Sequence, residues 1–224
     1  MEFLLFPLIA AGAYLMGGAN GAIICSRLVY KDDVRLHGSK NAGLTNFWRT
    51  YGKQSVFLLI LIDVLKTAIP VLLGGMFLVN YASFLQTEDR LMIGRTFAGF
   101  FAMLGHSYPV YYGFKGGKAV LAGGTVAIFI DYRVALFVWG LFFLALLLTR
   151  YVSLGSVLAG LAFPIAFAFF GFHPIALGLS AACGLFIVYR HHGNIARLLK
   201  GEERKVGSKG KKPPNQEGNT GGDA

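Results

Sequence analysis

The sequence carries little charge for its length, and acidic residues are the scarcest charged class. Only 14% of the 224 residues are Asp, Glu, Lys or Arg, and 55% are hydrophobic. This balance, with a mean hydropathy of +0.57, excludes an ordinary soluble domain and indicates a membrane protein. The chain has 11 acidic against 21 basic side chains, which gives a net charge of +10.

Cysteine is also scarce, with two residues, Cys25 and Cys183, both in or beside apolar runs. They imply neither a disulfide framework nor a CxxC metal site, and small buried hydrophobes are the simpler interpretation. The five histidines and 11 acidic residues have no spacing typical of metal ligands, so we expect no metal and no cofactor. The N-terminus lacks the basic region of a cleaved signal peptide, and we expect its apolar segment to remain as a membrane helix.

Long apolar runs fill most of the chain. A bilayer core requires about 20 apolar residues per helix, and the segments that approach this length are Phe3–Cys25, Val56–Tyr81, Leu91–Leu104, Val134–Leu148, Leu154–Phe170 and Pro174–Tyr189. The shorter run Val120–Ile130 adds one more segment if it also spans. We therefore predict an all-α, polytopic membrane bundle of about seven transmembrane helices.

Basic residues fall mainly on one side of these segments. With seven spans, 17 of the 21 Lys and Arg face the same side, and basic loops accumulate in the cytoplasm. We expect the N-terminus outside and the C-terminus in the cytoplasm. The same asymmetry explains the positive charge without nucleic acid, because basic residues beside a membrane are attracted to anionic membrane lipid.

The C-terminal end differs in composition from the rest. Residues 206–224 have no large hydrophobe after Val206 and are rich in Gly, Lys, Pro and Asn, which predicts a disordered polar tail. Residues 1–205 are predicted to form one integral membrane domain.

Three polar stretches lie between the apolar runs and face the predicted cytoplasmic side: Gly38–Arg49, Gly105–Lys118 and Arg190–Lys205. The first two combine glycines with hydroxyl, amide and ammonium groups, a composition that suits a phosphate oxygen. Lys115-Gly116-Gly117-Lys118 is not a Walker loop, because residue 112 is Tyr and residue 119 is Ala. ATP binding is therefore not supported.

Histidines in these stretches allow two interpretations. His191 and Asn194 follow an apolar run directly, so His191 is either a proton acceptor or a hydrogen bonder at the membrane surface. His106 precedes a Ser-Tyr-Pro turn, where a structural role is the simpler interpretation.

Taken together, the three stretches resemble the bacterial acyl-phosphate:glycerol-3-phosphate acyltransferases, integral membrane enzymes that make lysophosphatidic acid. The segments that carry the resemblance are DVRLHGSKNAGLTNFWRTYG, GHSYPVYYGFKGGKA and HHGNIARLLKGEE, which begin at Asp33, Gly105 and His191. They occur in the family's order, and the DVLK at Asp63–Lys66 is similar as well.

The chain departs from the family pattern at several positions. Lys40 and Ala119 stand where glycine is usual, Leu44 where alanine is usual, and Gly193 where glutamate is common. The first helix has Gly18-Ala19-Asn20 in place of a Ser-Ile-Pro stretch.

The resemblance implies transfer of a fatty acyl group from acyl phosphate to the sn-1 hydroxyl of glycerol 3-phosphate, with release of phosphate, at the cytoplasmic face of the bacterial inner (plasma) membrane. It implies catalytic roles for His191, Asn194 and Ser39. It implies substrate binding by Ser39, Asn41, Thr45, Asn46, Arg49, His106, Lys115, Gly116, Gly117, Lys118, His191 and Asn194. An enzyme that produces acyl phosphate is an expected partner.

Two catalytic devices of other acyltransferases are missing. No Asp lies five residues after any His, and no GxSxG elbow occurs. Acyl phosphate already has a stable leaving group, so positioning and electrostatic stabilisation can replace an activated nucleophile.

Other interpretations remain open at the level of sequence. A membrane carrier for a phosphorylated metabolite could use the same loops as an entry funnel, and a structural protein could use them only to bind anionic lipid. Asp63 and Lys66 lie at i and i+3 within an apolar run, where charge is costly. They form either a buried structural pair or part of the active site.

Overall fold

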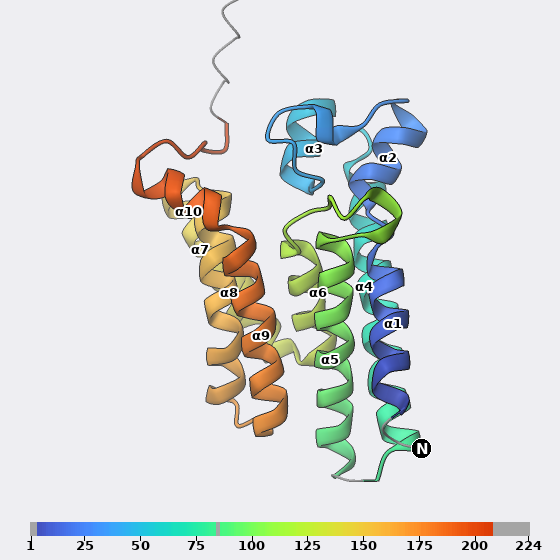
Figure 1. Ribbon diagram of the computed structural model, residues 1–224. Coiled ribbons are helices and arrows are strands. Elements are labelled where there is room, and N and C mark those ends of the chain that lie inside the picture. Colours follow the sequence, from blue (N-terminus) through green and yellow to red (C-terminus); the bar gives the residue numbers. More distant parts are fainter. Residues whose placement is uncertain (1–3, 84–85, 208–224) are drawn as a thin grey trace, which may run out of the picture.

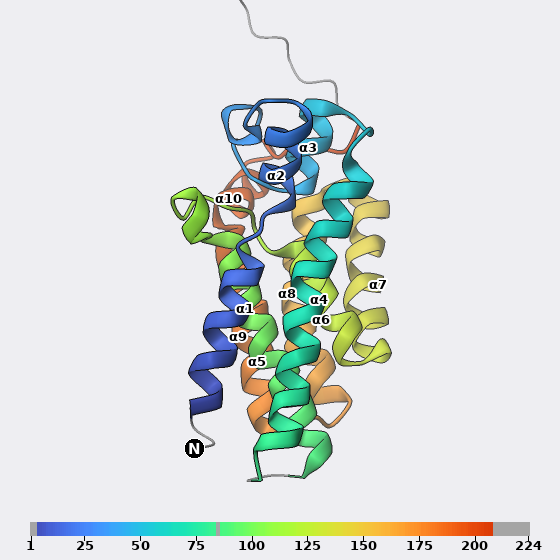
Figure 2. The ribbon, with the colours of Figure 1, turned by 90° about the vertical axis from the view of Figure 1, so that its right-hand side faces the viewer.

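The computed structural model describes residues 4–83 and 86–207, and helices are its main regular structure. Its elements are α1 (Leu5–Gly17), α2 (Gly21–Val29), η2 (Val34–Leu36), α3 (Leu44–Tyr51), α4 (Val56–Tyr81), α5 (Thr87–Ser107), η3 (Val110–Tyr112), α6 (Val120–Ile130), α7 (Tyr132–Thr149), α8 (Val152–Phe169), α9 (Pro174–Arg190) and α10 (His192–Leu199). The long helices run side by side in a bundle, as Figures 1 and 2 show. The predicted all-α class is confirmed. Most of the predicted tail, residues 208–224, lies outside the described residues.

The predicted count of about seven spans is supported only in part. Among the described residues, four helical segments are long and apolar enough to cross a membrane: the α1–α2 segment Leu5–Val29, α4, α7 and α8. A fifth is added if α9 and α10, which meet at a bend of 57°, count as one span.

Helices α5 and α6 differ from free-standing spans for physical reasons. The 21-residue α5 carries Arg90, Arg95 and His106, but it packs between α1, α4, α6 and α9, which shield it from lipid. The 11 residues of α6 reach only about 16 Å, roughly half of a bilayer core. Both are therefore interior elements of the bundle.

The first predicted span is broken rather than continuous. Asn20 adopts an extended backbone, and its side-chain oxygen accepts a hydrogen bond from the Ile23 N–H at 3.1 Å, which caps α2. The Asn20 amide nitrogen donates to the Ala42 carbonyl at 3.1 Å. This break directs α2 away from α1 and ties it to the first polar stretch.

Glycines let the helices approach closely. A Cβ on Gly94 would lie 2.4 Å from the Gly74 carbonyl oxygen, and one on Gly184 would lie 2.2 Å from the Gly160 oxygen. Small residues at such crossings are typical of membrane bundles. They join α4 to α5 in one part of the bundle and α8 to α9 in another.

The polar elements gather at one end. In Figure 1, α2, α3, α10 and the loop between α5 and α6 lie at the top, while the N-terminus lies at the bottom. The three polar stretches therefore converge, as the sequence predicted.

Candidate active site

A cavity of about 1530 Å³ opens at the polar end of the bundle and is bordered by all three polar stretches. Of the residues predicted from sequence, its lining includes Ser39, Asn41, Thr45, Asn46, Arg49, His106, Lys115, Gly116, Lys118, His191 and Asn194. Gly117 is buried behind this wall and is not part of it. Another part of the lining is apolar and includes Trp139, Phe142 and Phe143 of α7.

Asn46 organises the first polar stretch from inside. Its side-chain oxygen accepts from the Ser39 N–H at 2.9 Å, and its amide nitrogen donates to the carbonyls of Val34 and His37 at 3.0 and 3.1 Å. The Asn46 side chain is only 3% exposed, and its hydrogen bonds go to backbone groups of the protein. Gly38 has φ +55°, and a Cβ there would lie 2.4 Å from the Asn46 oxygen, so only glycine fits.

Two departures from the family pattern, Lys40 and Ala119, lie where the backbone has a positive φ. The φ of Lys40, +57°, lies in the left-handed region, which glycine adopts at little cost and other residues adopt at about 1–2 kcal/mol. Ala119, the other position where the family has glycine, also has φ +57°. Both departures therefore place a side chain where the backbone favours glycine.

We expect Lys40→Gly to stabilise the protein by about 1 kcal/mol, because glycine relieves the strain of the positive φ. Lys40 is exposed, so the substitution removes no buried contact. Lys53 is also exposed but has no positive φ, so Lys53→Gly should destabilise by up to about 1 kcal/mol. Thermal unfolding of the detergent-purified variants measures both. Equal shifts for the two variants would contradict this account.

The second stretch packs on the end of α5. The N–H groups of Gly116 and Gly117 donate to the carbonyls of Ser107 and His106, both at 3.1 Å. A Cβ on Gly117 would lie 2.1 Å from His106 Nε2. These glycines allow close packing and satisfy carbonyls that a helix end leaves open. Direct contact of Gly117 with a ligand stays a prediction.

The third stretch supplies a buried imidazole. His191 is 3% exposed, and its Nδ1 lies 2.8 Å from the Ile187 carbonyl oxygen. Because a carbonyl only accepts, Nδ1 carries the hydrogen and Nε2 is the nitrogen that can accept a proton.

Lys118 connects the second stretch to the third. Its ammonium donates to the Asn194 side-chain oxygen, and the Asn194 amide nitrogen donates to Glu203 at 2.7 Å. Glu203 also accepts from Arg197 at 2.8 Å. Burial lowers the pKa of Lys118 to about 8, and the charge of Arg197 acts in the same direction. Sequence reasoning assigned no role to Glu203, although it belongs to the third motif.

Asp63, Lys66 and His106 form a buried polar group. The Lys66 ammonium lies 2.8 Å from Asp63 and 2.9 Å from His106 Nδ1, and Asp63 also accepts from the Gly21 N–H at 3.0 Å. Asp63 and His106 border the cavity. The pair that sequence left open is therefore buried and also adjoins the site.

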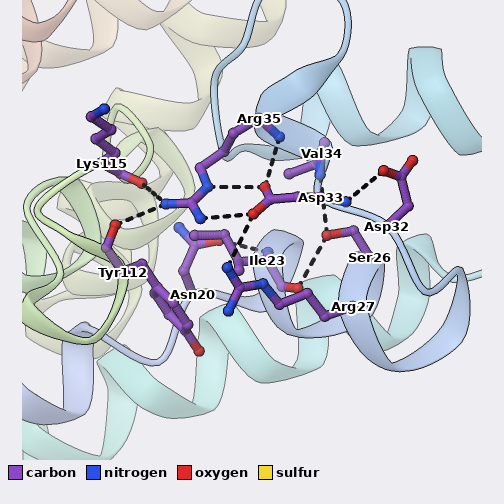
Figure 3. A network of polar contacts seen from close by, with 10 residues as sticks. All are labelled: Asn20, Ile23, Ser26, Arg27, Asp32, Asp33, Val34, Arg35, Tyr112 and Lys115. Carbon is purple, nitrogen blue, oxygen red and sulfur yellow. Dashed lines mark hydrogen bonds and ion pairs between the residues drawn. The ribbon is translucent and has the colours of Figure 1, made fainter.

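Asp33 and Arg35, which precede the first stretch, tie this part of the chain to the second stretch, as Figure 3 shows. Arg35 contacts both Asp33 oxygens, at 2.9 and 2.7 Å, and its Nη1 donates to the carbonyls of Tyr112 and Lys115 at 2.8 and 3.2 Å. The Arg35 guanidinium holds the pKa of Asp33 well below its usual value. This Asp-Val-Arg segment belongs to the first family motif, but the sequence alone predicts no role for its charged side chains.

We expect Arg35→Lys to lower kcat/KM on the order of 10–100-fold, because an ammonium cannot bridge Asp33 and two carbonyls at once. Arg27→Ala is the matched control. Arg27 contacts the same carboxylate at 3.1 Å with its side chain 51% exposed, and such pairs contribute about 1 kcal/mol or less. Steady-state kinetics compare the two, and equal losses would refute a special role for Arg35.

These features define a class: a helical membrane protein whose polar end encloses a basic cavity beside an apolar wall. The profile described as Glycerol-3-phosphate acyltransferase matches residues 7–201. The chain belongs to the glycerol-3-phosphate acyltransferase family, membrane enzymes that produce lysophosphatidic acid.

Individual relatives agree with this assignment. The Glycerol-3-phosphate acyltransferase of Finegoldia magna is 35% identical over 208 residues, which cover 92% of this chain and 99% of the relative. That of Bacillus subtilis is 35% identical, with 91% and 98% covered. Among solved structures, the glycerol 3-phosphate form of PlsY (YgiH) is 34% identical with a TM-score of 0.79, covering 90% of this chain and 96% of that one. Its lysophosphatidic acid form has 33% identity and a TM-score of 0.76, covering 90% and 95%.

Proposed function

We propose that the cavity transfers a fatty acyl group from acyl phosphate to the sn-1 hydroxyl of glycerol 3-phosphate and releases inorganic phosphate. The observation that carries this proposal is the composition of one continuous cavity. Cationic and amide groups from three stretches line its polar part, and Trp139, Phe142 and Phe143 line its apolar part. A soluble phosphate ester and a lipid-like acyl donor require both surfaces at once.

The polar part suits the phosphate of glycerol 3-phosphate. Lys118 and Arg49 supply positive charge, and the Ser39 hydroxyl borders the same space. Cationic donors form the stronger, charge-assisted hydrogen bonds with phosphate oxygens. The solved relative in its glycerol 3-phosphate form supports this substrate.

His191 and Asn194 are assigned to the reacting hydroxyl. Nε2 of His191 either accepts the proton of the sn-1 hydroxyl or orients that hydroxyl while the substrate's own phosphate takes the proton. The Asn194 side chain is held by Lys118 and Glu203, and it borders the same cavity as His191. The attack forms the new ester bond, and the bond between acyl carbon and phosphate oxygen breaks.

The donor follows from the chemistry of the site. Acyl phosphate is a mixed anhydride whose phosphate leaves readily, so a site that only positions and stabilises charge suffices. The relative in its lysophosphatidic acid form supports a product with an acyl chain in the same kind of site. We further propose that the polar end faces the cytoplasm of the plasma membrane, in line with the predicted excess of basic loops.

The direct test uses purified protein in a lipidic medium with acyl phosphate and glycerol 3-phosphate. Phosphate and lysophosphatidic acid should appear in equal amounts, and acyl-CoA in place of acyl phosphate should give no product. Product from acyl-CoA alone would overturn the donor. The absence of transfer from well-folded protein would overturn the proposal, and phosphate uptake into proteoliposomes would then favour the carrier alternative.

A further inference from the structure

A second, much smaller cavity lies deeper in the bundle than the first. It has about 10 Å³, room for about one water-sized sphere. Its lining is almost wholly apolar, and the Ser156 hydroxyl in it donates to the Val152 carbonyl at 2.8 Å. A void of this kind stays dry.

The order of the lining residues places this void below the main cavity. Val120 on α6, Phe142 on α7 and Ser156 on α8 border both cavities. The residues that border only the small one are Gly123, Gly124, Val138, Ala159, Phe163 and Ile187, each farther from the polar end along its own helix. On α6, α7, α8 and α9 alike, the void therefore lies beyond the main cavity, in the direction away from the polar end.

Trp139 is the bulkiest of the side chains that line both spaces. Its indole N–H donates to the Gly124 carbonyl at 3.3 Å, and its ring stacks on Phe143 with centroids 5.5 Å apart. A Cβ on Gly124 would lie 2.1 Å from the indole. The ring is thus fixed by α6 on one side and by a second aromatic ring on the other.

Trp139 lies ten residues before the end of α7 at Thr149, or about 15 Å along the helix axis. A chain whose phosphate end is bound by Lys118 and whose body follows the apolar wall would reach the indole from above. We propose that Trp139 forms the floor of the acyl-chain site and thereby sets the length of acyl chain that the enzyme prefers. This inference rests on the proposed acyl phosphate donor.

Two substitutions should move the preference in opposite directions. Trp139→Ala joins the main cavity to the void, so longer chains gain buried length. Gly124→Ala pushes the indole toward the main cavity, because the void is too small to receive it, so shorter chains are favoured. Burying one more methylene strengthens binding of the acyl chain about fourfold. For two chains that differ by two methylenes, the ratio of their kcat/KM values should therefore change on the order of tenfold between the wild type and a variant.

The experiment measures kcat/KM for a series of saturated acyl phosphates of increasing length. It compares the wild type, Trp139→Ala, Trp139→Phe and Gly124→Ala, with size-exclusion profiles as the folding check. Leu136→Ala is the matched control, since Leu136 is 70% exposed on the same helix and borders neither cavity. Its length profile should equal that of the wild type.

The outcomes separate this inference from the proposed function. No transfer by the folded wild type removes the donor and the inference together. Transfer with opposite shifts in Trp139→Ala and Gly124→Ala supports the floor. Transfer in which every chain length falls by one common factor overturns it, and if Trp139→Ala fails to fold, Trp139→Phe and Gly124→Ala decide by the same criterion.

Discussion

His191→Ala is expected to lower kcat/KM by about 10²–10⁴-fold, the range that general acid–base groups contribute. The reason is geometric. The bond from Nδ1 to the Ile187 carbonyl fixes the ring and leaves Nε2 as the nitrogen that can accept a proton, at a position only 3% exposed. Alanine removes both the acceptor and the group that excludes water there. Initial rates of lysophosphatidic acid formation at several glycerol 3-phosphate concentrations measure the effect.

The separate changes in kcat and KM identify the base. If Nε2 takes the proton, His191→Gln should be as impaired in kcat as His191→Ala, because an amide places a polar atom near Nε2 but accepts no proton at neutral pH. If the substrate phosphate takes the proton, His191→Gln should keep most of kcat, and His191→Ala should mainly raise KM. Full turnover in His191→Ala would rule out both roles.

His173→Ser serves as the control for these variants. His173 lies at the start of α9, the opposite end from His191, and its ring nitrogen accepts from the Ile175 N–H at 3.2 Å. Serine is a favoured residue at that capping position, so the helix end should persist. Activity of His173→Ser should stay close to that of the wild type, and a loss like that of His191→Ala would point to a general loss of fold.

The convergence of the three polar stretches was predictable, and so was the apolar character of the bundle. Both depend on composition and on the order of segments along the chain. The count of spans was less predictable, because α5 carries Arg90 and Arg95 and yet lies inside the bundle. Its shielding comes from neighbouring helices, and the local sequence of a helix does not show which neighbours it will have. The break at Asn20 depends on a capping bond that the long apolar run conceals.

Pairings between distant residues were the least predictable part of the site. Glu203 stands among basic residues near the tail, where sequence suggests a solvated charge, yet it accepts from Asn194 and Arg197. Arg35 reaches carbonyls 77 and 80 residues away. Gly116 and Gly117 were expected to face an anion, and their N–H groups are instead bonded to α5. Composition identifies such groups, but only the fold assigns their partners.

Lys118 should give the enzyme a pH limit on the alkaline side. Burial, reinforced by the charge of Arg197, lowers the pKa of its ammonium to about 8. The charged form that binds phosphate is therefore complete well below pH 8 and is lost as the pH rises through that value. We expect kcat/KM for glycerol 3-phosphate to fall about tenfold per pH unit above the pKa, since this parameter reports groups of the free enzyme.

The substrate does not explain such a limit, because a phosphate monoester loses its second proton near pH 6 and remains a dianion at higher pH. Lys118→Arg distinguishes the cause. A guanidinium stays charged at every pH below about 12, so this variant should lose the alkaline decline. It should also be less active near neutral pH, because the larger group cannot keep the contact that the Lys118 ammonium makes with Asn194.

Lys118→Met sets the scale of the effect. Removing a charged donor to a developing or bound anion costs about 10²–10³-fold in rate, and methionine keeps the length of the side chain while it removes the charge. Together the three proteins give a strict test by kcat/KM between pH 6 and pH 10. An alkaline decline that persists in Lys118→Arg would assign the titration to another group, and unchanged activity in Lys118→Met would remove Lys118 from phosphate binding.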